Sequence, residues 1–391
     1  MSDSDRFRFS VDRGGTFTDV YAEIPGEPGF KVVKLLSEDP QNYPDAPREG
    51  IRRILEAVLK KPISEDRLDA SRIEWIRMGT TVATNALLER KGARCALLVT
   101  RGFGDILQIG NQDRPHIFDL EIRKPDLLYE TVVEVDERLR VLQPDAPPPD
   151  GPVVEGISGD RLVVLEALDI EALRPRLRAV YDSGIRSLAV VLLHASAWPN
   201  HEQAIGRLAE AMGFTQISLS SRVMPRVKLV PRGDTTMVDA YLNPHIRTYL
   251  KSFREGFDDR LDRTNLLFMQ SDGGLAQADD FTGSRAILSG PAGGVVGYAM
   301  TTCGGACGQP VIGFDMGAPP PMSPVTATPT NWSSRAKSPA CASRRPNCTS
   351  RRWRPAAAAG SSSKTACSWW APNPPAPIPA RSATANRDIW R

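Results

Sequence analysis

Strand-like and helix-like patterns alternate along residues 7–317, and this alternation restricts the fold more than any other feature of the sequence. Phe7, Phe9 and Val11 recur at every second position, as in a strand with one buried face. Short apolar runs typical of buried strands are CALLVT, SLAVVLLHA, NLLFMQS and VIGFDMG. Apolar residues at helical spacing lie in or near 51–59, 82–88, 169–183, 200–212 and 235–255. The alternation predicts an α/β fold with mostly parallel sheets and helices on their faces.

Prolines mark two exceptions to this pattern. Pro244 is expected to interrupt the helical stretch 235–255, because proline lacks the amide hydrogen that a helix interior uses. The segment 144–159, QPDAPPPDGPVVEGIS, is rich in proline and glycine, so it predicts an exposed loop or insertion.

Basic residues are concentrated at the end of the chain. The formal net charge is +3, but the stretch from Ala318 onward holds eleven Lys or Arg residues and one acid, Asp388. The preceding residues hold 38 basic and 45 acidic side chains, a net charge of −7. The basic isoelectric point comes from this final stretch, so it gives no reason to expect a nucleic-acid partner.

Nothing in the sequence indicates secretion or membrane insertion. No stretch approaches the roughly 18 apolar residues of a membrane helix, and MSDSDRFRFS lacks the apolar core of a signal peptide. The spacing of Cys95, Cys303 and Cys307, the cysteines before Ala318, implies no disulfide framework. The four histidines show no metal-ligand spacing. These features predict a cytoplasmic enzyme with no membrane partner.

The segment DRGGTFTD, residues 12–19, is the most informative motif. A strand enters a tight turn at Gly14 and Gly15, and two threonines and a second acid follow. Glycines let backbone amides approach an anion, and hydroxyls donate to the same oxygens. The acids Asp12 and Asp19 suit contact with phosphate through Mg²⁺ or its water. The alternative is a plain β-hairpin whose glycines serve the turn. Acids on both sides of the turn favour phosphate, and the absence of GK[ST] excludes a Walker A loop.

Other candidate sites have structural alternatives of similar weight. Thr80, Thr81 and Asn85 lie at the start of a predicted helix, where they either cap it or bind an anion. Arg232 either clamps a carboxylate or phosphate, or lies in a solvated surface loop. The segment 271–274 follows a predicted strand, where α/β proteins often place ligands, but it is equally an ordinary turn.

A resemblance to a known family begins at this motif. DRGGTFTD is similar to the first phosphate loop of actin-like ATPases, in the form found in the hydantoinase A and 5-oxoprolinase family. The similarity continues, in order, through KLLSEDPQNYPDAPREGIRRIL, MGTTVATNALLERKGA, IFDLEIRKPDLLYETVVEVDERL, SLAVVLLHA, SLSSRVMPRVKLVPRGDTT, SDGGLA, SGPAGGVVGY and PVIGFDMG. It therefore covers residues 6–317. KLLSEDPQNYPDAP resembles 5-oxoprolinases more than hydantoin-cleaving relatives.

The resemblance implies actin-like, ribonuclease H-like lobes with mixed sheets and flanking helices. It divides the chain into an N-terminal domain, 6–230, the start of a hydantoinase A domain, 231–317, and a remainder, 318–391. It implies ATP-dependent hydrolysis of 5-oxo-L-proline to L-glutamate through phosphorylation of the lactam oxygen. An ATP-dependent hydantoinase or a related cyclic-amide enzyme is the alternative. The implied partners are a hydantoinase B-like half, fused or separate, and further copies of the chain.

The same resemblance implies roles for individual residues, with ATP and Mg²⁺ as cofactors. Catalytic roles are implied for Asp12 and Asp19, and Mg²⁺ contacts through water for Asp12 and Asp315. Phosphate contacts are implied for Gly14, Gly15, Thr16, Thr18, Asp315 and Gly317. 5-Oxoproline carries a carboxylate, and the candidates for binding it are Thr80, Thr81, Asn85 and Arg232.

The stretch after Gly317 differs from the family. It is rich in Ala, Pro, Arg and Ser but holds five of the seven tryptophans, whereas disordered segments are poor in aromatic residues. Where family members carry a second phosphate loop, DMGGTSTD, this chain reads DMGAPP. Adding one G to a back-translated sequence after the codon for Gly317 converts Gly-Ala-Pro-Pro-Pro-Met into Gly-Gly-Thr-Ser-Thr-Asp. The same shift from Ser362 onward yields Phe-Phe-Lys-Asp-Gly-Leu-Phe-Val-Val-Gly-Pro-Glu, which resembles the family's continuation.

Only the first base of each restored codon is open to choice, so chance does not explain so long a match. We interpret 318–391 as a non-native, disordered product of a single-base deletion, present either in the gene or in its reading. If the deletion is in the gene, the chain is an inactive truncated remnant or a binding-only module.

We expect resequencing across codons 310–325 to show one additional G near codon 318 if the deletion is a reading error. The second loop then returns as DMGGTSTD. If the deletion is real, the missing loop predicts that the encoded chain neither binds ATP tightly nor hydrolyses a lactam. An unchanged sequence together with tight ATP binding would contradict this interpretation.

Overall fold

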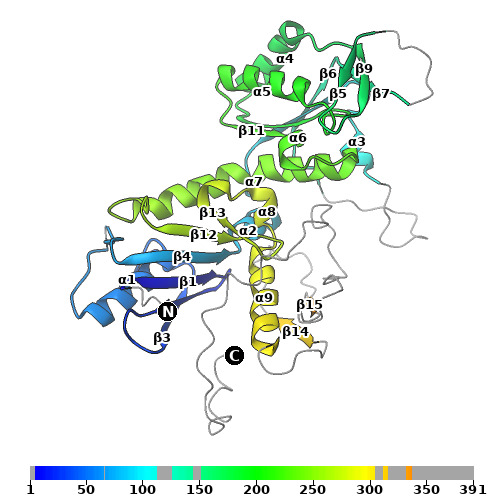
Figure 1. Ribbon diagram of the computed structural model, residues 1–391. Helices are drawn as coiled ribbons and strands as arrows, with labels where there is room; N and C mark the ends of the chain where they lie inside the picture. Colours follow the sequence, from blue (N-terminus) through cyan, green and yellow to red (C-terminus); the bar gives the residue numbers. More distant parts are fainter. Residues whose placement is uncertain are drawn as a thin grey trace.

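The computed structural model describes residues 5–65, 67–111, 126–143, 151–303, 311–315 and 332–336. Most of these residues form two lobes joined by the long helix α7, Leu229–Glu255 (Figure 1). One lobe is built on a six-stranded sheet and the other on a four-stranded sheet. The prediction of an α/β fold is therefore confirmed.

The six-stranded sheet has the order β13-β12-β4-β1-β2-β3. Its strands are β1 Phe7–Arg13, β2 Phe17–Glu23, β3 Phe30–Leu36, β4 Ile73–Thr80, β12 Asn265–Met269 and β13 Leu275–Gln277. β1, β2 and β3 are antiparallel, whereas β1, β4 and β12 run parallel. Short turns join β1 to β2 and β2 to β3, and such turns connect only antiparallel neighbours. The sheet is mixed, as the family resemblance implied, and not mostly parallel.

Helix α1, Ala46–Leu59, covers one face of β1, β2 and β3. The Asp45 carboxylate accepts a hydrogen bond from the amide of Arg48 at 3.0 Å, which caps the first turn. Ile51 and Ile54 of this helix are buried in the core. Gly50 lets the helix approach β2, because a Cβ atom there would lie 2.4 Å from Cγ2 of Val20.

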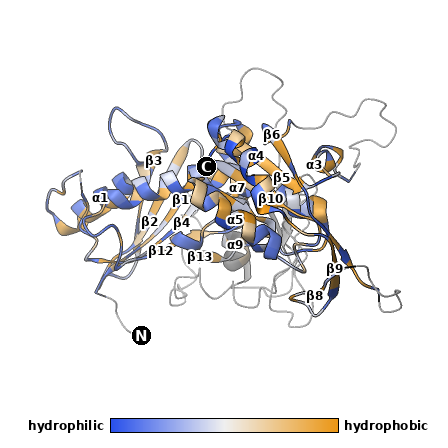
Figure 2. Ribbon diagram, turned by 90° about the horizontal axis from the view of Figure 1, so that it is seen from above, coloured by the Kyte–Doolittle hydropathy of each residue, from blue (hydrophilic) through white to orange (hydrophobic). Residues whose placement is uncertain are grey.

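The second lobe contains a parallel sheet of order β11-β10-β5-β6. Its strands are β5 Cys95–Thr100, β6 Thr131–Val135, β10 Ser187–Val191 and β11 Gln216–Leu219. Helices α4, Ile170–Asp182, and α5, Asn200–Met212, cover one face, and α7 packs on the other. Both faces of β5 and β10 are thus buried, which explains their continuous apolar sequences (Figure 2).

Shorter elements complete the described residues. They are the antiparallel strands β7 Arg138–Val141, β9 Arg161–Glu166 and β8 Val153–Glu155, and the helices α2 Val82–Leu88, α3 Ile106–Ile109, α6 Ser220–Val223, η1 Ala278–Asp280, α8 Gly283–Ala286 and α9 Ser289–Cys303. β8 lies inside the segment 144–159 that was predicted to be a loop, while 144–150 lies outside the described residues. No helix in the described ranges is both long and apolar enough to cross a membrane.

Helix α7 passes through Pro244 without a break, so the predicted interruption is wrong. In a regular helix the amide at position 244 would donate to the carbonyl of Ala240. Here the hydroxyl of Ser187, on β10, donates to that carbonyl at 2.6 Å. A side chain from the neighbouring sheet therefore replaces the missing donor.

The boundary at residue 230 stays a prediction, and strands from both sides of it share one sheet. β12 and β13 come from the segment 231–317, yet they extend the sheet that β1 and β4 begin. Beyond them, β14, Val311–Asp315, pairs antiparallel with β15, Trp332–Ala336. β15 lies in the segment that was predicted to be disordered and is its one described part.

Substitution of two helical glycines tests how closely α1 packs. We expect Gly50→Ala to lower the free energy of unfolding by about 1–3 kcal/mol, because the added methyl group meets Val20. Gly293→Ala in α9 is the matched control, since a Cβ atom there meets nothing within 4 Å. It should stabilise the protein by up to about 1 kcal/mol through helix propensity. Equal effects in chemical denaturation would contradict the packing of α1.

Candidate functional site

Three segments that the sequence singled out meet at one edge of the six-stranded sheet. β1, β4 and β12 are parallel, so their carboxyl ends lie at the same edge. The turn at Gly14 follows β1, Thr81 follows β4, and the turn 271–274 follows β12. Ligands of open α/β sheets bind outside the carboxyl ends of the strands. This edge is therefore the candidate site.

The turn between β1 and β2 is tight because of Gly14. Its amide donates to the carbonyl of Phe17 at 3.0 Å, and a Cβ atom at Gly14 would lie only 2.9 Å from that oxygen. Neither Gly14 nor Gly15 has a positive φ, so close approach and not a left-handed conformation requires glycine. The Gly14 amide serves the turn, whereas Gly15 and Thr16 are exposed at its tip.

Ser37, the residue after β3, holds this turn from one side. Its hydroxyl donates to the carbonyl of Gly14 at 2.7 Å, and its amide donates to the carbonyl of Thr16 at 2.9 Å. The hydroxyl oxygens of Ser37 and Thr18 are 3.0 Å apart. Ser37 has one hydroxyl proton, which goes to Gly14, so Thr18 donates to Ser37. Thr18 is fully buried, and its hydroxyl supports the loop instead of facing a ligand.

Ser37 is not among the site residues predicted from the sequence. It lies in KLLSEDPQNYPDAP, the stretch whose resemblance to 5-oxoprolinases was noted without a role for any residue. The sequence feature that could have indicated this role is a serine directly after β3, the strand that pairs with β2. That position places a short hydroxyl side chain beside the turn.

Thr81 holds the same turn from the other side. Its amide and its hydroxyl donate to the carbonyl of Arg13, at 3.1 and 3.2 Å. The side-chain amide of Asn85 donates to the Thr81 hydroxyl at 3.4 Å and lies near Gly15. The buried hydroxyl of Thr80 accepts from the amide of Val82 at 3.2 Å. These polar groups join the start of α2 to the turn, which gives them a structural role at the candidate site.

The two acids of the motif have different surroundings. Asp19 is paired with Lys34, whose ammonium lies 2.8 and 2.9 Å from its two carboxylate oxygens. Asp12 is exposed and lies beside Gly79 of β4, where a Cβ atom would be 3.6 Å from its Oδ1. No cluster of three or more metal-ligating side chains occurs among the described residues. A single carboxylate suits Mg²⁺, which commonly binds through phosphate and water with few protein ligands.

Arg232 lies in the second lobe and not at this edge. Its guanidinium is fully buried and donates to the carbonyls of Leu192 and Arg226, at 2.5 and 2.7 Å. Its Nε donates to the hydroxyl of Ser220 at 3.0 Å, and that hydroxyl donates to Glu202 at 2.6 Å. Burial lowers the pKa of Arg232 and raises that of Glu202. The predicted substrate clamp is thus a structural group in this conformation, neither solvated nor open to a ligand.

Asp315 is the one residue of the second loop that lies within the described residues. Asp315 ends β14, opposite Trp332, and Gly317 lies outside the described residues. β14 packs beside α9. The first residue of α9, Ser289, donates its hydroxyl to the carbonyl of Thr80. The start of α9 therefore reaches the candidate site, while β14 lies near the other end of that helix (Figure 1).

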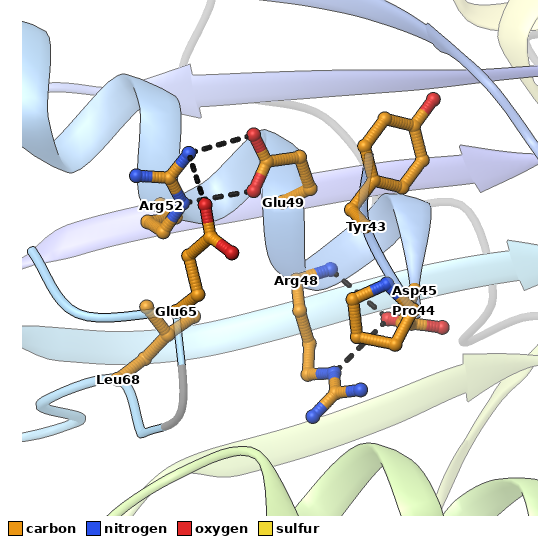
Figure 3. Close-up of a pocket in the computed structure, with 8 residues that line it drawn as sticks. All are labelled: Tyr43, Pro44, Asp45, Arg48, Glu49, Arg52, Glu65 and Leu68. Atoms are coloured by element: carbon orange, nitrogen blue, oxygen red, sulfur yellow. Dashed lines mark hydrogen bonds and ion pairs between the residues drawn. The ribbon is translucent and has the colours of Figure 1, made fainter. Parts of the chain in front are cut away.

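A small cavity lies beside the start of α1 (Figure 3). It is lined by Tyr43, Pro44, Asp45, Arg48, Glu49, Arg52, Glu65 and Leu68. Arg52 pairs with Glu49 and Glu56 at 2.8 Å, so its charge is already balanced. The hydroxyl of Tyr43 donates to the carbonyl of Leu36, directly before Ser37. The cavity walls thus support the segment that holds the turn.

Known proteins resemble this chain over most of its length. The family model "Hydantoinase/oxoprolinase N-terminal region" matches residues 8–213, and "Hydantoinase/oxoprolinase" matches residues 232–319. "5-oxoprolinase 1" of Arabidopsis thaliana is 56% identical over 313 residues, which cover 80% of this chain and 25% of that protein. "5-oxoprolinase" of Dictyostelium discoideum is 50% identical over 328 residues, covering 79% of this chain and 26% of that protein. The chain thus spans about a quarter of these relatives.

A solved structure shares the fold. The ATP-dependent caprolactamase from Pseudomonas jessenii has a TM-score of 0.62 and is 24% identical. The match covers 84% of this chain and 43% of the caprolactamase chain. At this identity the likeness concerns the arrangement of strands and helices.

The role of Ser37 can be tested by removing its hydroxyl. We expect Ser37→Ala to lower the free energy of unfolding by about 1–3 kcal/mol, because the carbonyl of Gly14 and the buried hydroxyl of Thr18 lose a partner. Ser158→Ala is the matched control, since its hydroxyl bonds to Asp160 at the exposed surface; its effect should stay within about 0.5 kcal/mol. Equal changes in the free energy of unfolding for the two variants, measured by urea denaturation, would contradict the role of Ser37 in holding the turn.

Proposed function

Because the chain belongs to the hydantoinase/oxoprolinase family, we propose that it is the ATP-binding N-terminal part of an enzyme that hydrolyses 5-oxo-L-proline to L-glutamate. One observation carries this proposal. The turn at Gly14 and Gly15 is held rigidly at the carboxyl edge of the sheet, with exposed Asp12 next to it.

The residues present fit a nucleotide phosphate. Gly15 and Thr16 are exposed at the tip of the turn, so their amides and the Thr16 hydroxyl are placed to donate to phosphate oxygens. Thr18, Ser37 and Thr81 fix the backbone that carries these donors. Prepositioned donors stabilise developing charge better than donors that must reorganise.

Asp12 is the proposed Mg²⁺-orienting residue on this lobe. Its carboxylate is exposed and lies beside Gly79, so the neighbouring strand leaves room next to it. Asp315 is the corresponding proposal for the second loop. Asp19, held by Lys34, is placed to order water or to keep the hairpin in register.

ATP supplies the phosphoryl group that converts the lactam oxygen into a leaving group. An unstrained lactam is a poor electrophile, so this activation couples ring opening to nucleotide hydrolysis. Thr81 and Asn85 lie next to the phosphate turn and remain the proposed contacts for the substrate carboxylate, whereas buried Thr80 and Arg232 are left out of the site. The remaining parts of the enzyme, including a hydantoinase B-like half and further copies of the chain, are proposed to supply the rest of the active site.

A second candidate applies to the chain as written. The family match ends at residue 319, where the second loop reads DMGAPP instead of DMGGTSTD. Successive prolines have no amide hydrogens to offer a phosphate. The chain without its restored loop is then an inactive remnant or a binding-only module. High identity to proteins named 5-oxoprolinase favours that substrate over hydantoins for the restored enzyme.

The assignment of Asp12 is tested in the full-length, frame-restored protein. We expect Asp12→Asn to lower kcat for 5-oxoproline-dependent ATP hydrolysis at least about 100-fold, since the carboxylate proposed to orient Mg²⁺ is removed. Asp182→Asn is the control, because Asp182 lies at the far end of α4 and is paired with Arg178 at the surface. Unimpaired turnover by Asp12→Asn would contradict the assigned role.

A further inference from the structure

One face of β2 and β3 carries an unusual concentration of exposed apolar side chains. Among the described residues, eleven large hydrophobic side chains are exposed, and four of them lie on this face: Phe17, Phe30, Val32 and Leu36. Their exposed fractions are 47%, 58%, 53% and 46%. Phe17 is opposite Leu36, and half-buried Tyr21 is opposite Val32 and contacts the ring of Phe30. These five residues form two apolar clusters, Phe17 with Leu36 and Tyr21 with Val32 and Phe30, and the Asp19–Lys34 pair lies between the clusters. The two clusters together are here termed the apolar strip.

The opposite face of the same strands is fully packed. Val20 and Ala22 of β2 and Leu35 of β3 are buried, and α1 contacts both strands from that side. Successive residues of a strand point to opposite faces, so α1 and the apolar strip lie on opposite sides of the sheet. Exposed apolar patches rimmed by polar residues mark interaction sites.

Two groups of charged residues, one within the apolar strip and one beside it, are already paired. Lys34 pairs with Asp19 at 2.8 Å. Arg8 pairs with Glu74 at 2.8 Å and with Glu23 at 3.5 Å. A segment that covers this face therefore meets little unbalanced charge, and apolar contact is the main attraction that the strip offers. An amphipathic helix with one apolar side has the matching chemistry.

The length of the matched relatives indicates what covers this face. The chain corresponds to only 25% of the length of the Arabidopsis relative, so most of that polypeptide lies outside the matched region. β3 is the edge strand, and its lysines Lys31 and Lys34 oppose pairing of two β3 edges from separate copies.

We propose that the apolar strip is the docking surface for downstream polypeptide, the part that the longer relatives carry beyond the region matched by this chain. The docked element is an amphipathic helix that buries Phe17, Phe30, Val32 and Leu36. This contact joins the first lobe to the remainder of the enzyme. The contact involves neither nucleotide nor substrate, so it can be tested independently of the proposed catalytic activity.

Site-specific cysteine labelling tests this contact. Val32→Cys and the control Ile157→Cys are made in the 391-residue chain and in the frame-restored, full-length protein. Ile157 is 73% exposed and lies between β8 and β9, and Figure 1 shows β9 in the second lobe. Each protein reacts with a maleimide, and peptide mass spectrometry follows the label at position 32 or 157. We expect the rate at position 32 to fall at least tenfold in the full-length protein, and the rate at position 157 to stay equal.

Equal rates at position 32 in the two proteins would overturn the proposal. Protection of position 32 in the short chain that increases with protein concentration would also overturn it, because a second copy would then be the occupant. If Val32→Cys impairs folding, hydrogen exchange of β3 amides in the unmodified proteins gives the same comparison. Protection confined to the full-length form supports the proposal, and equal exchange contradicts it.

Discussion

The parallel pairing of β1 with β4 is the contact on which the site depends. It joins residues 7–13 to residues 73–80, which are separated by β2, β3 and the whole of α1. A parallel neighbour requires a long crossover, and α1 supplies it while covering the inner face of the sheet. Because the two strands run in the same direction, the glycine turn and Thr81 reach the same edge. Thr81 can then bond to the carbonyl of Arg13 and hold the turn.

Elements with strong local signals were predicted closely from the sequence. The patterns at 169–183 and 200–212 correspond to α4 and α5 within one residue at each end. α4 begins at Asp169, whose carboxylate accepts from the amides of Glu171 and Ala172. Both helices also bury a regular apolar side. Here local propensity, capping and burial all favour the same structure.

Local sequence was a poor guide where a hydrogen-bonding group is satisfied by a residue far away in the sequence. Pro244 removes a helix donor, and the sequence around it gives no sign that Ser187 replaces that donor from another strand. Thr18 and Arg232 raise the same difficulty. Hydroxyl and guanidinium groups suit phosphate and carboxylate ligands, but they equally satisfy buried backbone carbonyls. Only the packing shows that Arg232 is fully enclosed and that the proton of Thr18 points to Ser37.

The candidate site combines a rigid interior with an open side. Ser37 and Thr81 hold the turn from two directions, and Gly15, Thr16 and Asp12 remain exposed beyond them. Such a turn can place donors and one carboxylate, but it cannot enclose a nucleotide from this side alone. Exclusion of water, which strengthens electrostatic interactions in an active site, requires a second surface facing the first. The apolar strip on β2 and β3 shares β2 with this turn. The segment that carries the phosphate turn therefore also carries part of the apolar surface that is proposed to contact the rest of the enzyme.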